Sequence, residues 1–246
     1  HAQPASAVDL WKMTSHQLVG LLSHPNHWFA YRARAELAAR RDAFVVAELK
    51  NTIATSADGR LVLGALWALH VTAGIDDELA LHLLEHSYPY VRYWAIRLVG
   101  DRKSASPALV KQFVRMSASE PSAVVRGQLA ATAKRLPATD GLQIVASLLK
   151  GFPQENDARV PLLIWWAIES RAMSDAGLVT KTFSEEAMWR NPAARENNLR
   201  LVRRYAADGT PAGYAACAQI LNTAPVDFRA AAVDQLRVGL AERAVG

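Results

Sequence analysis

The stretch SYPYVRYWAIRLVG (residues 87–100) carries a proline and, three residues later, an arginine at the start of an apolar segment with helical spacing. Proline is tolerated in the first turn of a helix, because the amides there have no intrahelical partner. An arginine recurs along the chain in steps of 32, 34, 33, 36 and 34 residues, at Arg60, Arg92, Arg126, Arg159, Arg195 and Arg229. Such a period is typical of α-solenoids, in which each repeat is a pair of helices.

Aligned on these six arginines (the arginine ladder), the chain divides into seven predicted helix pairs. In pairs two, three, five and seven, apolar or small residues fall three, four and seven positions after the arginine, which is the helical period, and no stretch alternates with period two. Only the first pair lacks an arginine in register, and Arg32 is its nearest candidate. We expect the pairs at residues 14–41, 42–74, 76–103, 106–137, 139–173, 175–208 and 210–244.

The predicted fold class is therefore all-α, an α-α superhelix of the HEAT or armadillo type. We expect one solenoid domain over residues 14–246. Residues 1–13 begin with His1 and a linker-like AQPASA tract, and we interpret them as a tag remnant or linker. Gly74, Gly100 and Gly209 fall where second helices are expected to stop.

The composition narrows the classes of function. The chain has 246 residues, of which 51% are hydrophobic, and a formal net charge of +5, which permits nucleic-acid binding without requiring it. Its one cysteine, Cys217, lies in a run of small residues and is expected to be buried, so no internal disulfide can form. The longest apolar run, residues 160–168, is too short to span a membrane.

Three turns give the chain a resemblance to HEAT repeats, although the aspartate often found before the proline is missing. They are Ser87–Arg92, Glu120–Arg126 and Asn191–Arg195, each with a proline before the arginine that opens a second helix. The likeness covers nearly the whole chain. It implies a repeat scaffold, in which the second helices line the concave side.

A narrower resemblance rests on the tracts QLVGLLSHPNHWFAYRARAELAAR (17–40), ALWALH (65–70), PYVRYWAIRLVGD (89–101) and VPLLIWWAIES (160–170). They look like the HEAT region of large multidomain proteins of planctomycetes and related bacteria. Those proteins join a propeller-like dehydrogenase domain, HEAT repeats and a c-type cytochrome domain with a Cys-x-x-Cys-His tract. This chain has no such tract, so the resemblance implies an extracytoplasmic (periplasmic) spacer and docking module without the redox chemistry.

Two histidine patterns could bind a metal. His82, Glu85 and His86 spell the inverted zinc-peptidase pattern, which on a helix would place two imidazoles one turn apart. His24 and His27 flank a turn. We favour surface residues for the first pattern and turn-capping residues for the second. We expect no catalytic residue, no cofactor and no metal site.

The tryptophans separate into two groups. Trp67 and Trp166 lie seven residues after an arginine and are predicted to pack in the core, whereas Trp165 is expected to be half-buried. Trp94 belongs to another face of the second helices, together with Val62, Arg97 and Ile164. This face is either an exposed interaction stripe or is covered by tight superhelical curvature.

A second hypothesis is a DNA-binding or DNA-repair HEAT protein with a basic concave face. Its basic residues would be Lys134, Arg135, Arg190, Arg195, Arg200, Arg203 and Arg204, and Asp157, Glu169 and Trp165 are compatible with a glycosylase-like cleft. Interleaved acids such as Glu185, Glu186, Glu196 and Asp208 favour an ordinary solvated helix face instead.

The ladder arginines could form a row for an anionic ligand, but we favour a structural role, in which each binds carbonyls or acids of a neighbouring turn. The prediction is a non-enzymatic scaffold that binds a protein or the flanking domains of a parent chain, and we expect a monomer. The candidate contact residues are Trp94, Arg97, Ile164, Arg200 and Arg203.

Overall fold

The computed structural model describes residues 9–243, and its chain divides into two compact units, residues 1–94 and 95–246. No strand occurs within residues 9–243, which confirms the all-α prediction. The described helices are α1 (Ser15–Gly20), α2 (His27–Arg40), α3 (Val46–Thr55), α4 (Gly59–Thr72), α5 (Asp77–Leu83), α6 (Pro89–Asp101), α7 (Pro107–Ser117), α8 (Ala123–Ala133), α9 (Ala138–Gly151), α10 (Val160–Ala172), α11 (Ala176–Phe183), α12 (Glu186–Arg190), α13 (Pro192–Asp208), α14 (Pro211–Thr223) and α15 (Val226–Arg243).

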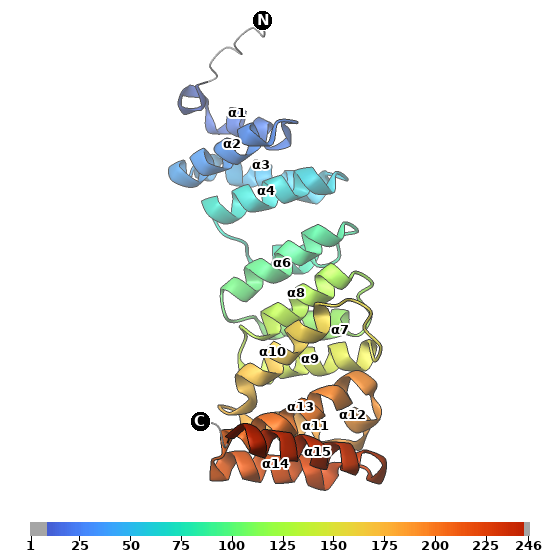
Figure 1. Cartoon of the computed structure of the whole chain (residues 1–246). Coiled ribbons are helices and arrows are strands. Elements are labelled where there is room, and N and C mark those ends of the chain that lie inside the picture. The colour runs from blue at the N-terminus through green and yellow to red at the C-terminus, as the bar shows by residue number, and fades with distance from the viewer. Residues whose placement is uncertain (1–8, 244–246) are drawn as a thin grey trace, which may run out of the picture. The chain divides into compact units, whose positions relative to one another are not determined.

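In the N-terminal unit, consecutive helices pack against each other, α1 on α2 and α3 on α4 (Figure 1). The start of α1 is fixed by a capping box between Thr14 and Gln17, at the position that the sequence predicts. Residues 1–8 lie outside the described part. Residues 9–13, which we had assigned to the linker, include a short 3-10 helix, η1 (Leu10–Lys12), whose Leu10 is buried, so this part of the expected linker packs onto the unit.

In the C-terminal unit, α8 packs against α9 and α10, and α13 packs against α14 and α15. The largest fully buried side chains include Phe113, Phe183, Trp189 and Tyr205, which lie on four of the helices α7 to α13. Figure 1 shows α13 and α15 side by side in this unit. The expected last pair ended at residue 244, which is outside the described residues.

The glycines show where the helix boundaries were predicted well. Gly209, with a φ of 73°, caps the end of α13 in the left-handed region, as expected. Gly100 does not stop a helix, because α6 continues through it to Asp101. A β-carbon at Gly100 would lie 2.7 Å from Thr132 Oγ1, so this glycine permits the close approach of α6 to α8.

The arginine ladder proves to contain two kinds of position. Arg92, Arg126, Arg195 and Arg229 are each the fourth residue of a helix, whereas Arg60 is the second residue of α4 and Arg159 is the N-cap of α10. Arginines at nearly constant spacing in the sequence therefore occupy different positions in their helices, and this difference alters which residues of α10 are buried.

Candidate interaction surface

Arg126 donates hydrogen bonds through all three nitrogens of its guanidinium group. Its Nε and Nη2 donate to the two carboxylate oxygens of Glu155 at 2.6 and 2.7 Å, and its Nη1 donates to the carbonyls of Glu120 and Pro121, both at 2.9 Å. The Arg126 and Glu155 side chains are only 9% and 4% exposed. The ring of Phe152 lies 4.2 Å from the guanidinium carbon. The hydrogen bonds from Arg126 hold the pKa of Glu155 below its usual range, although burial opposes this.

The other arginines at the fourth helical position share parts of this arrangement. Arg92 donates to the carbonyls of His86 and Ser87, and Arg229 donates to the carbonyl of Ala224, in each case in the turn before its own helix. Arg195 stacks over Phe228, 4.4 Å from the ring centroid. The carbonyl bonds of Arg92, Arg126 and Arg229 are thus made within the turn before the arginine's own helix, and Arg126 and Arg195 also contact an aromatic ring further along the chain.

The two arginines at other positions have none of these bonds. Arg60 and Arg159 are exposed, and their side chains make no hydrogen bond or ion pair within residues 9–243. Bonds to turn carbonyls are thus made by three of the four arginines at the fourth helical position, Arg92, Arg126 and Arg229. The structural role of the whole ladder stays a prediction.

The register of α10 differs from the prediction. Counting from Arg159 placed Leu162, Leu163 and Trp166 in the core, but Leu162 and Trp166 are exposed, Trp166 by 45%. Ile164, which we expected on the exposed stripe, is buried, with 4% exposure. The reason is that Arg159 lies before the helix begins: the residues three and seven after Pro161, Ile164 and Ile168, are the buried ones. Val233 on α15 is likewise exposed instead of buried.

A groove with a volume of about 650 Å³ lies between α10, α13 and α15, and partly exposed residues of α10 line it. Leu162 and Trp165 contribute its apolar wall from α10, and Leu199 and Ala207 contribute to the wall from α13. Its polar residues are Glu196, Arg200, Arg203, Arg204, Gln235 and Glu242. Two of the five predicted contact residues, Arg200 and Arg203, therefore line one groove, and the apolar residues beside them were missed because the register was counted from Arg159.

Every arginine of the groove is paired with an acid. Arg200 lies 3.2 Å from Glu196, Arg203 Nε donates to Glu242 at 3.0 Å, and Arg204 lies 3.2 Å from Glu169 and 3.8 Å from Asp208. The hydrogen bond and charge of Glu242 raise the pKa of Arg203, and Arg203 lowers the pKa of Glu242 in return. The groove is thus close to neutral, unlike a track for phosphates.

The remaining predicted contact residues, Trp94 and Arg97, lie outside this groove. Trp94 belongs to the N-terminal unit, where it packs edge-on against Trp67 at 5.1 Å, and Arg34 lies 4.7 Å from the Trp67 ring. Trp67 is half-buried, so its predicted packing role is met in part. Val62, expected on the same stripe, is fully buried. Arg97 lies in α6, in the C-terminal unit.

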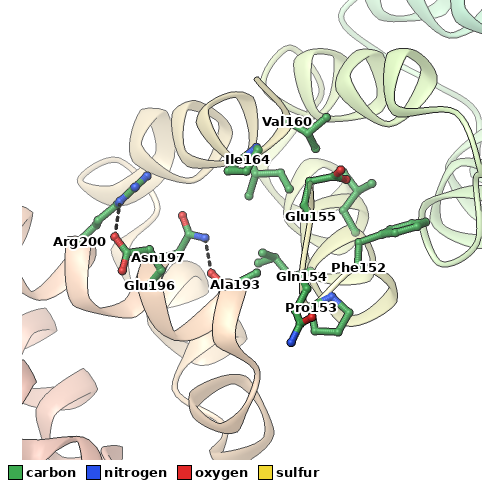
Figure 2. A pocket seen from close by; sticks show the side chains of 13 residues that line it. Phe152, Pro153, Gln154, Glu155, Val160, Ile164, Ala193, Glu196, Asn197 and Arg200 are labelled. Atoms are coloured by element: carbon green, nitrogen blue, oxygen red, sulfur yellow. Dashed lines mark hydrogen bonds and ion pairs between the residues drawn. The ribbon is translucent and has the colours of Figure 1, made fainter. Parts of the chain in front are cut away.

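A smaller cavity, with a volume of about 220 Å³, adjoins the groove and shares Glu196 and Arg200 with it. It lies between the end of α9, the turn before α10, the start of α10 and the start of α13. Figure 2 shows Ile164 and Val160 on one side of it, Phe152 and Pro153 on another, and Asn197 on the α13 side. Its walls are mostly apolar.

The histidine patterns do not have the geometry that a metal site requires. Helix α5 ends at Leu83, so Glu85 and His86 lie in the following turn and not one helical turn from His82. His86 Nδ1 accepts a hydrogen bond from the amide of Tyr88, and burial lowers the pKa of this histidine. His24 Nδ1 similarly accepts from the amide of Asn26 in its turn. Within residues 9–243, no three histidine, cysteine or acidic side chains gather.

Cys217 is buried as predicted, and burial raises the pKa of its thiol. Among the described helices, none is sufficiently long and apolar to cross a membrane. Comparison with known proteins finds no matching family model and no matching curated protein.

Proposed function

We propose that this chain is a non-catalytic, HEAT-like interaction module whose groove between α10, α13 and α15 binds a segment of a partner protein. In this proposal, the helices form seven repeat pairs of a solenoid, and the partner is another protein or a flanking domain of a longer extracytoplasmic redox protein. The observation that carries it is the apolar wall of α10, formed by the exposed Leu162 and the half-buried Trp165, beside Arg200 and Arg203 in one groove of about 650 Å³.

The composition of the groove favours a protein partner. Tryptophan and arginine are the side chains that most often dominate the energy of protein interfaces, and an apolar floor with a charged rim is the usual anatomy of such a site. Trp166, one residue along from Trp165, extends the apolar surface outside the groove. Paired charges on the rim favour specificity, because a partner that does not match them must leave them unpaired.

The DNA-binding alternative has weaker support. Five of the six arginines that it requires are paired with acids: Arg135 with Asp101, Arg190 with Glu186, and the three groove arginines with Glu196, Glu242 and Glu169. A phosphate backbone would have to displace these carboxylates and then lie among them.

The test is a peptide library displayed on phage and selected on the intact chain. We expect the selected peptides to lose affinity at least about tenfold, equivalent to about 1.4 kcal/mol, for Leu162→Ser and for Trp165→Ala. The matched control is Val124→Ser, which changes a similarly exposed apolar residue on α8 outside the groove and should leave affinity unchanged.

Selected peptides that bind Leu162→Ser, Trp165→Ala and Val124→Ser with equal affinity would refute the proposal that the groove binds the partner segment. Salt-sensitive retention of the chain on duplex DNA, with a loss on Arg200→Ala, would favour the DNA-binding alternative instead.

A further inference from the structure

The walls of the cavity beside the groove are held in place by bonds within the chain. The ring of Phe152, which lines the cavity, packs against the guanidinium group of Arg126 at 4.2 Å. Asn191 Nδ2 donates to the carbonyl of Leu149 at 2.9 Å, which joins the start of α13 to the end of α9. A site that is formed before its ligand arrives loses less conformational entropy on binding.

The polar side chains in the walls offer no partner to a group that is buried in the cavity. Both oxygens of Glu155 accept hydrogen bonds from Arg126. Asn197 Nδ2 donates to the carbonyl of Ala193 at 2.8 Å (Figure 2), and Asn197 Oδ1 is buried beyond the reach of a molecule in the cavity. A hydroxyl or N–H carried into the cavity would therefore lose its bonds to water without gaining a side-chain partner.

The other polar lining residues lie on the solvent side. Glu196 and Arg200 are partly exposed, are paired with each other at 3.2 Å, and are shared with the groove. Gln154 is exposed, and its side-chain amide makes no hydrogen bond within residues 9–243. An amide has both donors and an acceptor, so Gln154 suits the peptide groups of a bound segment and not the tip of a buried side chain.

The volume indicates the size of the side chain that the cavity accepts. An engineered apolar cavity of about 150 Å³ binds benzene. This cavity, at about 220 Å³, is about half as large again, which leaves room for a benzene ring and the methylene that joins it to a backbone. A leucine side chain is smaller and would leave the cavity partly empty, whereas a tyrosine or a tryptophan would bury a polar hydrogen without a partner.

We infer that this cavity is an anchor pocket for the side chain of a phenylalanine in the partner segment. This inference rests on the proposed function, because the cavity adjoins the groove that the segment would occupy. The phenyl ring packs between Ile164 and the Phe152–Pro153 turn, and the backbone of the segment stays at the solvent side, beside Gln154.

The test compares N-acetyl-phenylalaninamide with N-acetyl-tyrosinamide, which differ only in the hydroxyl at the tip of the ring. Their polar backbone groups stay outside the apolar cavity, so the tip of the ring is the part that enters it. Binding to the intact ¹⁵N-labelled chain is followed by NMR titration. We expect the phenylalanine compound to bind about tenfold more tightly, because the tyrosine hydroxyl loses water without gaining a partner.

A pair of matched variants locates the binding. Ala193 and Ala212 each follow the proline that opens a helix, and only Ala193 lines the cavity. Ala193→Leu fills the cavity and should abolish binding of N-acetyl-phenylalaninamide, whereas Ala212→Leu should bind as the parent chain does. Equal affinity of the two compounds for the parent chain, or unchanged binding to Ala193→Leu, would overturn the anchor pocket.

The outcomes separate this inference from the proposed function. Peptides that depend on Leu162 and Trp165 but not on Ala193, and that lack phenylalanine, would support the groove and overturn the anchor. Binding of N-acetyl-phenylalaninamide that is lost in Ala193→Leu, without any peptide that depends on Leu162 and Trp165, would support the pocket and overturn the groove.

Discussion

The replacement Arg126→Ala should strongly destabilise the C-terminal unit. It leaves the Glu155 carboxylate, 4% exposed, without its bidentate partner, and it removes two hydrogen bonds to turn carbonyls and the packing on Phe152. Breaking a buried ion pair from one side costs about 3–5 kcal/mol. For a protein of this size, about 2–4 °C of melting temperature is lost per kcal/mol, so we expect a decrease of about 6–20 °C.

The assay is urea and thermal unfolding followed by circular dichroism, with Arg159→Ala as the matched control. Arg159 belongs to the same sequence ladder but is exposed, and its side chain makes no hydrogen bond or ion pair within residues 9–243, so its loss should change stability by less than about 0.5 kcal/mol. Equal losses for the two variants would refute the argument that position four in the helix, and not spacing, gives the arginine its role.

The effect should also depend on pH in a defined direction. Arg126 lowers the pKa of Glu155 in the folded chain, so this pair stabilises fully above the unfolded pKa of a glutamate, about 4.3, and its contribution is lost as the pH falls through the lower folded value. The difference between the parent chain and Arg126→Ala should therefore shrink below about pH 4. The double variant Arg126→Ala/Glu155→Gln should be less destabilised than the sum of the two single variants, because no buried charge remains.

Two further predictions concern packing. Gly100→Ala places a methyl group 2.7 Å from the buried Thr132 Oγ1 and should lower the free energy of unfolding in urea by about 1–3 kcal/mol. Gly177→Ala, in α11 with open space around it, should raise that free energy by about 0.5–1 kcal/mol. The opposite order would contradict the close approach of α6 to α8. Cys217, buried and with a raised thiol pKa, should not react with a thiol reagent in the native chain and should react fully in urea, and rapid native labelling would contradict its burial.

The helices could be predicted from the sequence because their signals are local. Apolar spacing, the capping box at Thr14, Pro107 at the start of α7 and Gly209 after α13 each act within one helical turn, and each falls where the structure has a helix boundary. The stop expected at Gly100 failed for a non-local reason, since the glycine serves contact with Thr132, which is 32 positions further along the chain.

The site was harder to predict, because it depends on how α10 is rotated about its axis. The turn from Phe152 to Arg159 that precedes α10 is longer than the turn from Ala118 to Ser122 that precedes α8, and Arg159 is still in that turn when the helix begins. In the burial pattern of α10, Pro161 takes the place that the ladder arginine has in the sequence pattern. Because Arg159 lies only two residues before Pro161, the sequence period stays nearly intact. The period therefore cannot show that the buried face has moved from Leu162 and Trp166 to Ile164 and Ile168.

The same lengthened turn connects the stability of this region with its surface. It brings Glu155 to Arg126 of α8, and Asp157 Oδ1 accepts hydrogen bonds from the amides of Arg159 and Val160 at the start of α10. Because these bonds fix the beginning of α10, they also fix the positions of the exposed Leu162 and the half-buried Trp165 at the groove. A partly exposed apolar face whose position is fixed by polar bonds in this way is expected where the face is used for binding.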